Sequence, residues 1–106
     1  MHETVFARRL ITEANRHGDV TEIDLEIGEL APVPALDLVE TMRRLVPWKI
    51  KFNEKQSKVT CKCGYKGRPK ILERGHDFFF IECPNCGDIP TIDDGTEIKL
   101  IKIKVR

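Results

Sequence analysis

The sequence has no apolar run long enough to cross a bilayer, no excess of one charge and few aromatic residues. No stretch approaches the roughly 18 consecutive apolar residues of a membrane span. Its 18 basic and 17 acidic side chains leave a net charge of +1, which gives no bulk attraction to nucleic acid or anionic membranes. The first residues, Met-His-Glu-Thr, lack the charged and apolar regions of a signal peptide. We therefore expect a soluble, cytoplasmic protein without a membrane partner.

Recognisable catalytic groupings are also missing. The sequence shows no Ser or Cys grouped with His and Asp, no phosphate-binding glycine loop and no GxGxxG. Its 106 residues allow one compact domain, or a small domain with a lobe held together by metal. These features favour a binding protein over an enzyme.

Apolar residues at helical spacing predict two helices. The first covers residues 3–17 and is ended by Gly18. The second covers residues 35–46, with Pro34 suited to its first turn and Pro47 ending it. Each helix has one apolar stripe, so both need a surface to pack against.

Alternating apolar and charged residues predict three strands, at 20–30, 48–52 and 97–106. The first is acidic on its polar face and the other two are basic. Since opposite charges on neighbouring strands attract and like charges repel, we expect the acidic strand in the middle. The predicted fold class is α+β, with two helices on the apolar face of this three-stranded sheet and an inserted zinc-ribbon lobe.

The last predicted strand has an irregular apolar pattern. Ile101, Ile103 and Val105 fall on one face, whereas Leu100 falls on the other. This change of parity predicts a bulge, or burial on both faces, between Leu100 and Ile101.

The four cysteines occur in two close pairs separated by 19 residues, Cys61-Lys62-Cys63-Gly64 and Cys83-Pro84-Asn85-Cys86-Gly87. Thiols stay reduced in the expected compartment, so this spacing indicates a metal site more than two disulfides. Four thiolates fill a tetrahedral zinc site and leave no position for a catalytic water, which makes the predicted role structural. Two disulfides, unbound thiols and a rubredoxin-like iron site remain as alternatives.

The cysteine segment interrupts the α+β pattern. We predict a zinc-ribbon domain at 58–92, inserted into a discontinuous domain made of 1–57 and 93–106. A strand is expected at 78–82, with 66–72 as its partner.

The first three residues form a second candidate metal site. The amine of Met1, the backbone amide and imidazole of His2, and Glu3 can wrap a divalent ion, and planar nitrogen donors suit Ni(II) or Cu(II). A frayed helix start, with Glu3 favoured by the helix dipole, is the alternative. His76 is either an extra nickel ligand or a solvent-facing turn residue.

These features together resemble the HypA/HybF family. The motifs are Met-His-Glu at the N-terminus, a helix, the strand end Ile27-Gly28-Glu29-Leu30, a second helix and two ordered cysteine pairs. Members of that family are nickel metallochaperones for maturing [NiFe]-hydrogenase, and some serve urease. The resemblance implies nickel bound by Met1, His2 and Glu3, zinc bound by the four cysteines, and delivery with a HypB-type GTPase to a hydrogenase large-subunit precursor. The chain departs from the family in its one-residue gap between Cys61 and Cys63 and in its short length.

Other features suggest other functions. A basic run, Lys66, Arg68, Lys70 and Arg74, together with a zinc ribbon, would suit a module that binds nucleic acid or acts as a protein-interaction adaptor. A solvated face explains the same run. The aromatic residues at 78–80 either pack around the lobe or mark an interface. The short linker to the inserted lobe is compatible with a homodimer that exchanges a strand or domain.

Overall fold

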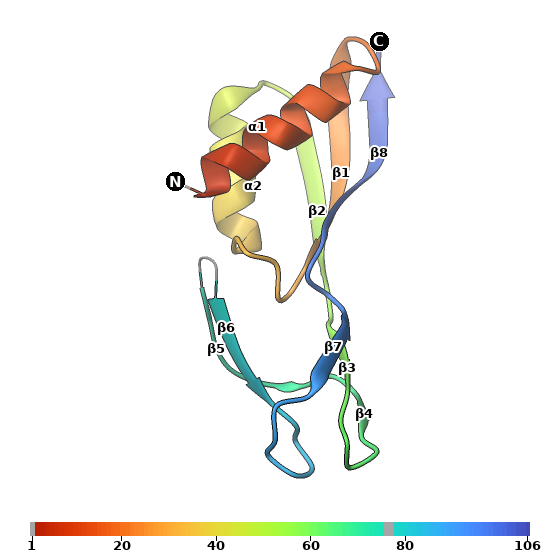
Figure 1. Cartoon of the computed structure of the whole chain (residues 1–106). Coiled ribbons are helices and arrows are strands. Elements are labelled where there is room, and N and C mark those ends of the chain that lie inside the picture. The colour runs from red at the N-terminus through yellow and green to blue at the C-terminus, as the bar shows by residue number, and fades with distance from the viewer. Residues whose placement is uncertain (1, 76–77) are drawn as a thin grey trace.

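The computed structural model describes residues 2–75 and 78–106, which form two helices and eight strands (Figure 1). In chain order these are α1 (His2–Asn15), β1 (Val20–Gly28), α2 (Ala35–Leu45), β2 (Lys49–Lys55), β3 (Lys58–Thr60), β4 (Lys66–Gly67), β5 (Lys70–Gly75), β6 (Phe78–Glu82), β7 (Thr91–Asp94) and β8 (Ile98–Val105). The molecule is elongated, measuring 51 × 24 × 16 Å, with both helices at one end and β3 to β7 at the other. Neither helix of the described part is long and apolar enough to cross a bilayer.

The largest sheet has the order β2-β1-β8, with the acidic strand in the middle as predicted from charge. β1 runs parallel to β2 and antiparallel to β8. Glu22 of β1 lies 3.6 Å from Lys51 on one side and 3.5 Å from Lys104 on the other, and Glu26 lies 3.9 Å from Lys55. The lysines of these pairs are 36–60% exposed, so the pairs set the strand order more than they add stability.

The predicted irregularity in β8 is a bulge. Asp24 of β1 pairs with Lys102 and Leu25 pairs with Leu100, which leaves Ile101 as the extra residue. Ile101 is 54% exposed, so the expectation that it shares the apolar face with Ile103 is wrong. The bulged residue shifts the alternation by one position, which lets both Leu100 and Ile103 pack against the core.

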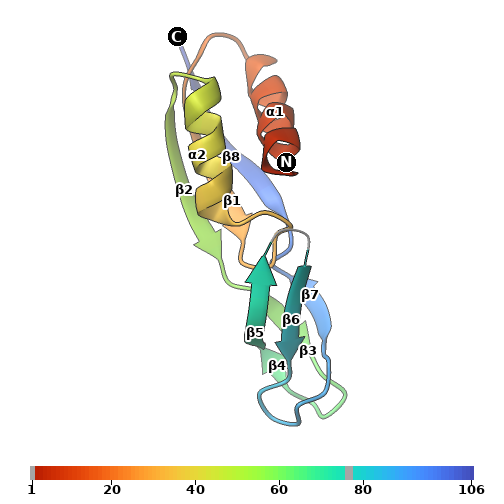
Figure 2. The ribbon, with the colours of Figure 1, turned by 90° about the vertical axis from the view of Figure 1, so that its left-hand side faces the viewer.

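The main core lies between the helices and this sheet, and Figure 2 shows both helices in front of the strands. Its largest fully buried side chains are Ile23, Leu25 and Ile27 of β1, Leu38, Val39 and Met42 of α2, and Val33 of the segment between them. Pro34 is the extended residue that immediately precedes α2 and does not lie within its first turn, and the helix ends at extended Val46, just before Pro47.

The far end of the molecule contains two small sheets, β4-β3-β7 and β5-β6. The predicted strand at 78–82 is present, but only part of its predicted partner pairs with it. Lys66 and Gly67 pair with β3, and β5 begins at Lys70. Pro69 separates the two strands because it has no N–H to donate and fixes its backbone angle.

Candidate metal centre

The four cysteines form one cluster, in which the ligating atoms all lie within 4.8 Å of one another. The sulfur atoms of Cys61 and Cys86 are 3.4 Å apart, and those of Cys63 and Cys83 are 3.6 Å apart. All four are free thiols. Two sulfurs bound to one tetrahedral zinc ion at about 2.3 Å lie about 3.8 Å from each other. The cluster therefore fits a zinc site without rearrangement of the fold.

The first cysteine turn closes over a single intervening residue. The N–H of Gly64 donates to the carbonyl of Cys61 at 2.9 Å, and the N–H of Cys61 donates to the carbonyl of Tyr65 at 2.9 Å. Gly64 has a φ of +96°, a backbone angle that side chains other than glycine's adopt at a cost. The turn reverses the chain immediately after Cys63, so the short gap still brings both sulfurs to one point.

The second cysteine turn is one residue longer and is closed in the same way. The N–H of Gly87 donates to the carbonyl of Cys83 at 2.9 Å, and the N–H of Cys83 donates to the carbonyl of Asp88 at 2.8 Å. Gly87, like the glycine of the first turn, has a positive φ, of +82°. The first pair of cysteines is one residue closer in sequence than the second pair, but the turn at Gly64 still places both of its sulfurs in the cluster.

Each turn contributes one buried and one exposed thiol. Cys61 and Cys83 are buried, whereas Cys63 and Cys86 are exposed. The side-chain amide of Asn85 donates to the sulfur of Cys63 at 3.5 Å. A zinc ion held here would have all four of its tetrahedral positions filled by protein sulfurs. It would have no open position for a reacting water, so its role would be structural.

The two exposed thiols differ in acidity. The Asn85 amide and the backbone near Tyr65 lower the pKa of Cys63 to about 6, despite some desolvation. The backbone N–H of Asp88 favours the thiolate of Cys86, but the hydrogen bond with Cys61, together with desolvation and the other sulfurs, raises the pKa of Cys86 to about 12. A divalent metal that binds the sulfur of Cys86 therefore has to displace its proton.

The predicted nickel ligands fall largely outside what the structure describes. Met1 and His76 lie outside the described residues, and so does the side chain of His2, which is the first residue of α1. Glu3 lies in the first turn of α1, where the helix dipole favours a negative charge. The nickel set thus stays a prediction.

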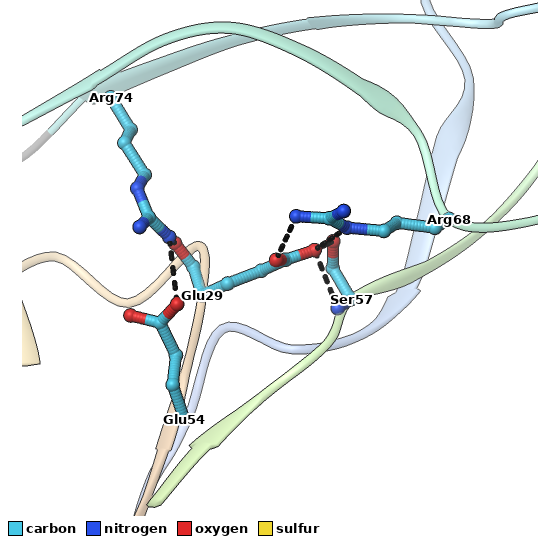
Figure 3. A network of polar contacts seen from close by, with 5 residues as sticks. All are labelled: Glu29, Glu54, Ser57, Arg68 and Arg74. Atoms are coloured by element: carbon cyan, nitrogen blue, oxygen red, sulfur yellow. Dashed lines mark hydrogen bonds and ion pairs between the residues drawn. The ribbon is translucent and has the colours of Figure 1, made fainter.

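One cluster of polar side chains was not predicted, and it joins the two ends of the molecule (Figure 3). Glu29 is only 4% exposed, and its carboxylate accepts four hydrogen bonds. The N–H and hydroxyl of Ser57 donate to Oε1 at 2.9 and 2.6 Å, and Arg68 donates to Oε1 and Oε2 at 3.1 and 2.9 Å. Burial opposes the charge of Glu29, but Arg68 and Ser57 offset it, so its pKa is lowered.

The basic run is not a free cationic surface. In addition to the pair between Arg68 and Glu29, Lys70 lies 3.5 Å from Glu82. Arg74 lies 3.3 Å from Glu54 (Figure 3). Three of the four cations in the run are therefore paired within the chain, which weakens the nucleic-acid hypothesis. All four side chains are nevertheless exposed, as the solvated-face interpretation expects.

The three adjacent aromatic residues have different environments. Phe78 and Phe80 are 43% and 58% exposed, with ring centroids 5.8 Å apart. Phe79 points the other way and packs with the small core. The expected packing around the lobe thus holds for one of the three residues.

Comparison with known proteins identifies the fold. No protein-family model matches the chain, and no curated protein matches it. Among solved structures, the chain is similar to the solution structure of the Ni metallochaperone HypA from Helicobacter pylori, with 16% identity over 97% of this chain and 96% of that one and a TM-score of 0.62. It is also similar to a second solution structure of a HypA protein, with 18% identity, 100% and 97% coverage and a TM-score of 0.60. The resemblance predicted from sequence is confirmed at the level of the fold.

Proposed function

We propose that this chain is a cytoplasmic nickel metallochaperone of the HypA kind. The observation that carries the proposal is the fold, which follows that of a nickel metallochaperone over 97% of the chain. In the sequence, Met1 directly precedes α1, which begins with His2 and Glu3. The fold shared with two HypA structures and the nitrogen and oxygen donors that this tripeptide carries support the same function.

Nickel is the cargo, and its proposed ligands are the three N-terminal residues. The amine of Met1 with the amide and imidazole of His2 supplies nitrogen donors, and Glu3 adds an oxygen or assists removal of the amide proton. Donors on one short segment can be exchanged one at a time for those of an acceptor. His76 is the candidate for an additional ligand.

Zinc is the proposed structural metal, held by Cys61, Cys63, Cys83 and Cys86. The proposed zinc-ribbon domain covers 58–92, and the nickel-binding domain combines 1–57 with 93–106. This division needs one refinement, because Leu30 packs in the small core with Val59 and Ile81. The zinc-ribbon lobe therefore depends on a side chain from the other domain.

The proposed partners follow from the proposed role. Delivery would involve a HypB-type GTPase and the precursor of a nickel enzyme, with the [NiFe]-hydrogenase large subunit as the expected acceptor. The protein would act by handing over a metal ion, not by catalysing a reaction.

Nickel titration of untagged protein tests the N-terminal site. In a His2→Ala variant we expect nickel affinity to fall by about 100-fold or more, because loss of a group that merely hydrogen-bonds to a metal ligand already costs about 10- to 100-fold. Isothermal titration calorimetry measures the change, and zinc content should stay the same. His17→Ala is the matched control, since His17 is an exposed histidine at the other end of α1.

Extension of the N-terminus provides the second arm of this experiment. One extra residue before Met1 removes the free amine from the chelate while leaving every side chain in place. Nickel affinity should fall as it does in His2→Ala. Equal nickel affinity in all four proteins would rule out the proposed site.

A further inference from the structure

The main sheet has two edge strands, and β8 is the less covered of them. In β2, Ile50 is buried in the core, and α2 lies on that side of the sheet (Figure 2). No residue of β8 is buried, and among the described residues β8 pairs with β1 alone. Its Ile101 and Val105 are 54% and 44% exposed. The outer edge of β8 therefore presents backbone N–H and C=O groups to which another strand could bind.

A groove runs between α1 and this edge. It consists of two adjoining open hollows, of about 280 and 540 Å³, which share Arg9, Leu10 and Ile98 in their lining. On the side of the sheet it follows residues 96–101. The large apolar side chains that line it are Phe6, Leu10, Ile98, Leu100 and Ile101. Because alternate side chains of a strand point to the same face, a strand added beside β8 could place its apolar residues in this groove.

The polar side of β8 is basic. Its lysines lie opposite the three acidic residues of β1, and Lys104 is 3.5 Å from Glu22. A strand added to β8 would lie about 4.8 Å from β8 and about 10 Å from β1. The second distance is about one Debye length at physiological salt, so the nearer lysines dominate. Charge therefore favours acidic residues on the polar side of an added strand.

The same charges disfavour a second copy of this chain as the occupant. Two β8 strands paired edge to edge would place lysines beside lysines, which repel. Lysines and bulges are also the features by which edge strands avoid pairing with their own kind, and β8 has both, with its bulge at Ile101. The strand that β8 does accept on its other edge, β1, alternates acidic and apolar residues. A compatible partner strand thus has the chemistry of β1.

We propose that β8 is a docking edge for an extended segment of a partner protein in which acidic and apolar residues alternate. The segment joins the sheet as a fourth strand, and its backbone pairs with the outer edge of β8. Its acidic residues lie beside Lys99, Lys102 and Lys104, and its apolar residues enter the groove against α1. This surface lies at the opposite end of the molecule from the cysteine turns and uses no metal, so it goes beyond the proposed function.

Titration of the zinc-loaded, untagged protein with synthetic peptides tests the proposal, and NMR chemical shifts locate the contact. The probe has the sequence of β1, residues 20–28. In one control peptide its three acidic residues are replaced by lysine. In the other, the same nine residues are reordered so that the acidic ones are consecutive. We expect the probe to bind about tenfold or more tighter than either control, with the largest shifts at residues 98–105 and on the side of α1 that lines the groove.

Variants of exposed side chains assign the contact to β8. Lys102→Gln should weaken binding of the probe about two- to fivefold, the range for one cross-strand charge pair. Ile101→Ser should weaken it by a similar factor, because apolar contact in the groove is lost. Lys49→Gln is the matched control, since Lys49 is an exposed lysine of the other edge strand, and it should leave binding unchanged.

Three results would overturn the proposal. The first is no binding at millimolar probe, or equal binding of the probe and the control peptides. The second is an equal loss of affinity in Lys49→Gln and Lys102→Gln, which would place the probe away from β8. The third is a dimer of the protein alone, seen by sedimentation and strengthened by Lys102→Gln, which would make a second copy the occupant. Since none of these measurements involves nickel, they stand apart from the titration of His2→Ala.

Discussion

A Cys83→Ser variant is expected to lack zinc and to have an unfolded segment at 58–94, while the β2-β1-β8 sheet keeps its structure. The small core that serves this segment has three buried residues, Leu30, Val59 and Ile81. A structural zinc site of this kind contributes about 10–16 kcal/mol of apparent binding free energy in small domains. That exceeds or matches the whole stability of a typical domain, about 5–15 kcal/mol, so the segment should not fold without the metal.

Metal analysis and residue-resolved hydrogen exchange check this expectation together. The wild type should contain one zinc ion per chain, and Cys83→Ser should contain far less, with amides of β3, β6 and β7 unprotected. Lys62→Ser is the matched control, because Lys62 is exposed and lies between two of the cysteines without contributing a thiol. A Cys83→Ser variant that keeps both its zinc and its protected amides would show that the cluster is not the source of stability.

Metal and thiol analysis of the wild-type protein also separates a zinc site from the alternative interpretations of the four cysteines. A rubredoxin-like site would contain iron. Two disulfides would leave no titratable thiol after denaturation, whereas a zinc site should release four. The sulfur–sulfur distances of 3.4 and 3.6 Å join a cysteine of one turn to a cysteine of the other, as a shared ion requires.

The sequence was sufficient wherever the determining interactions are local or repeated along an element. Two cysteines within a short turn imply a chelate regardless of the fold, and a following glycine permits the turn. The order of the main sheet followed from charge because each strand carries one sign on its polar face, so several pairs such as Glu22 with Lys51 and Lys104 agree. The bulge beside Ile101 followed from parity, since alternation leaves one residue too many.

The junction between the two ends could not be predicted, because its members are far apart along the chain. Glu29 meets Ser57 after 28 residues and Arg68 after 39. A glutamate at a strand end next to a glycine is by itself compatible with solvent exposure. Only the three-dimensional fold shows that the segment joining β2 to β3 brings Ser57 to this carboxylate. The segment joining β7 to β8 lies beside it, where the carbonyl of Gly95 accepts the N–H of Leu30.

The same limitation applies to the boundary between the domains. Sequence placed the boundary at residue 58, where the cysteine segment begins, and so assigned Leu30 to the first domain. Leu30 instead packs against Val59 and Ile81 at the other end of the molecule. One apolar residue in a proline-marked connection carries no periodic signal that would indicate which core it joins.

Gly95 lies in the segment between β7 and β8, where it packs directly against Ser57 of the segment between β2 and β3. Its replacement by alanine is expected to lower the free energy of unfolding by about 4 kcal/mol. A Cβ atom there would lie 2.5 Å from the Cα of Ser57, and the residue has a φ of +107°. Unfavourable backbone geometry costs about 1–3 kcal/mol and overpacking costs about 1–3 kcal/mol more. The neighbouring atoms are the N, Cα and Cβ of Ser57, which do not move when a side chain rotates, so neither contribution can be relieved in that way.

Gly18→Ala is the matched control for this substitution. Gly18 has a similar φ of +123°, but a Cβ there would meet only the side chain of Val105 at 3.8 Å, an ordinary contact distance. Its replacement should therefore cost only the backbone contribution, about 1–2 kcal/mol. Chemical denaturation of both zinc-loaded variants separates the two effects, because the difference between them is the clash with Ser57. Equal losses of stability would mean that the backbone around Gly95 and Ser57 can relax. In that case the packed backbone would not fix the position of Glu29.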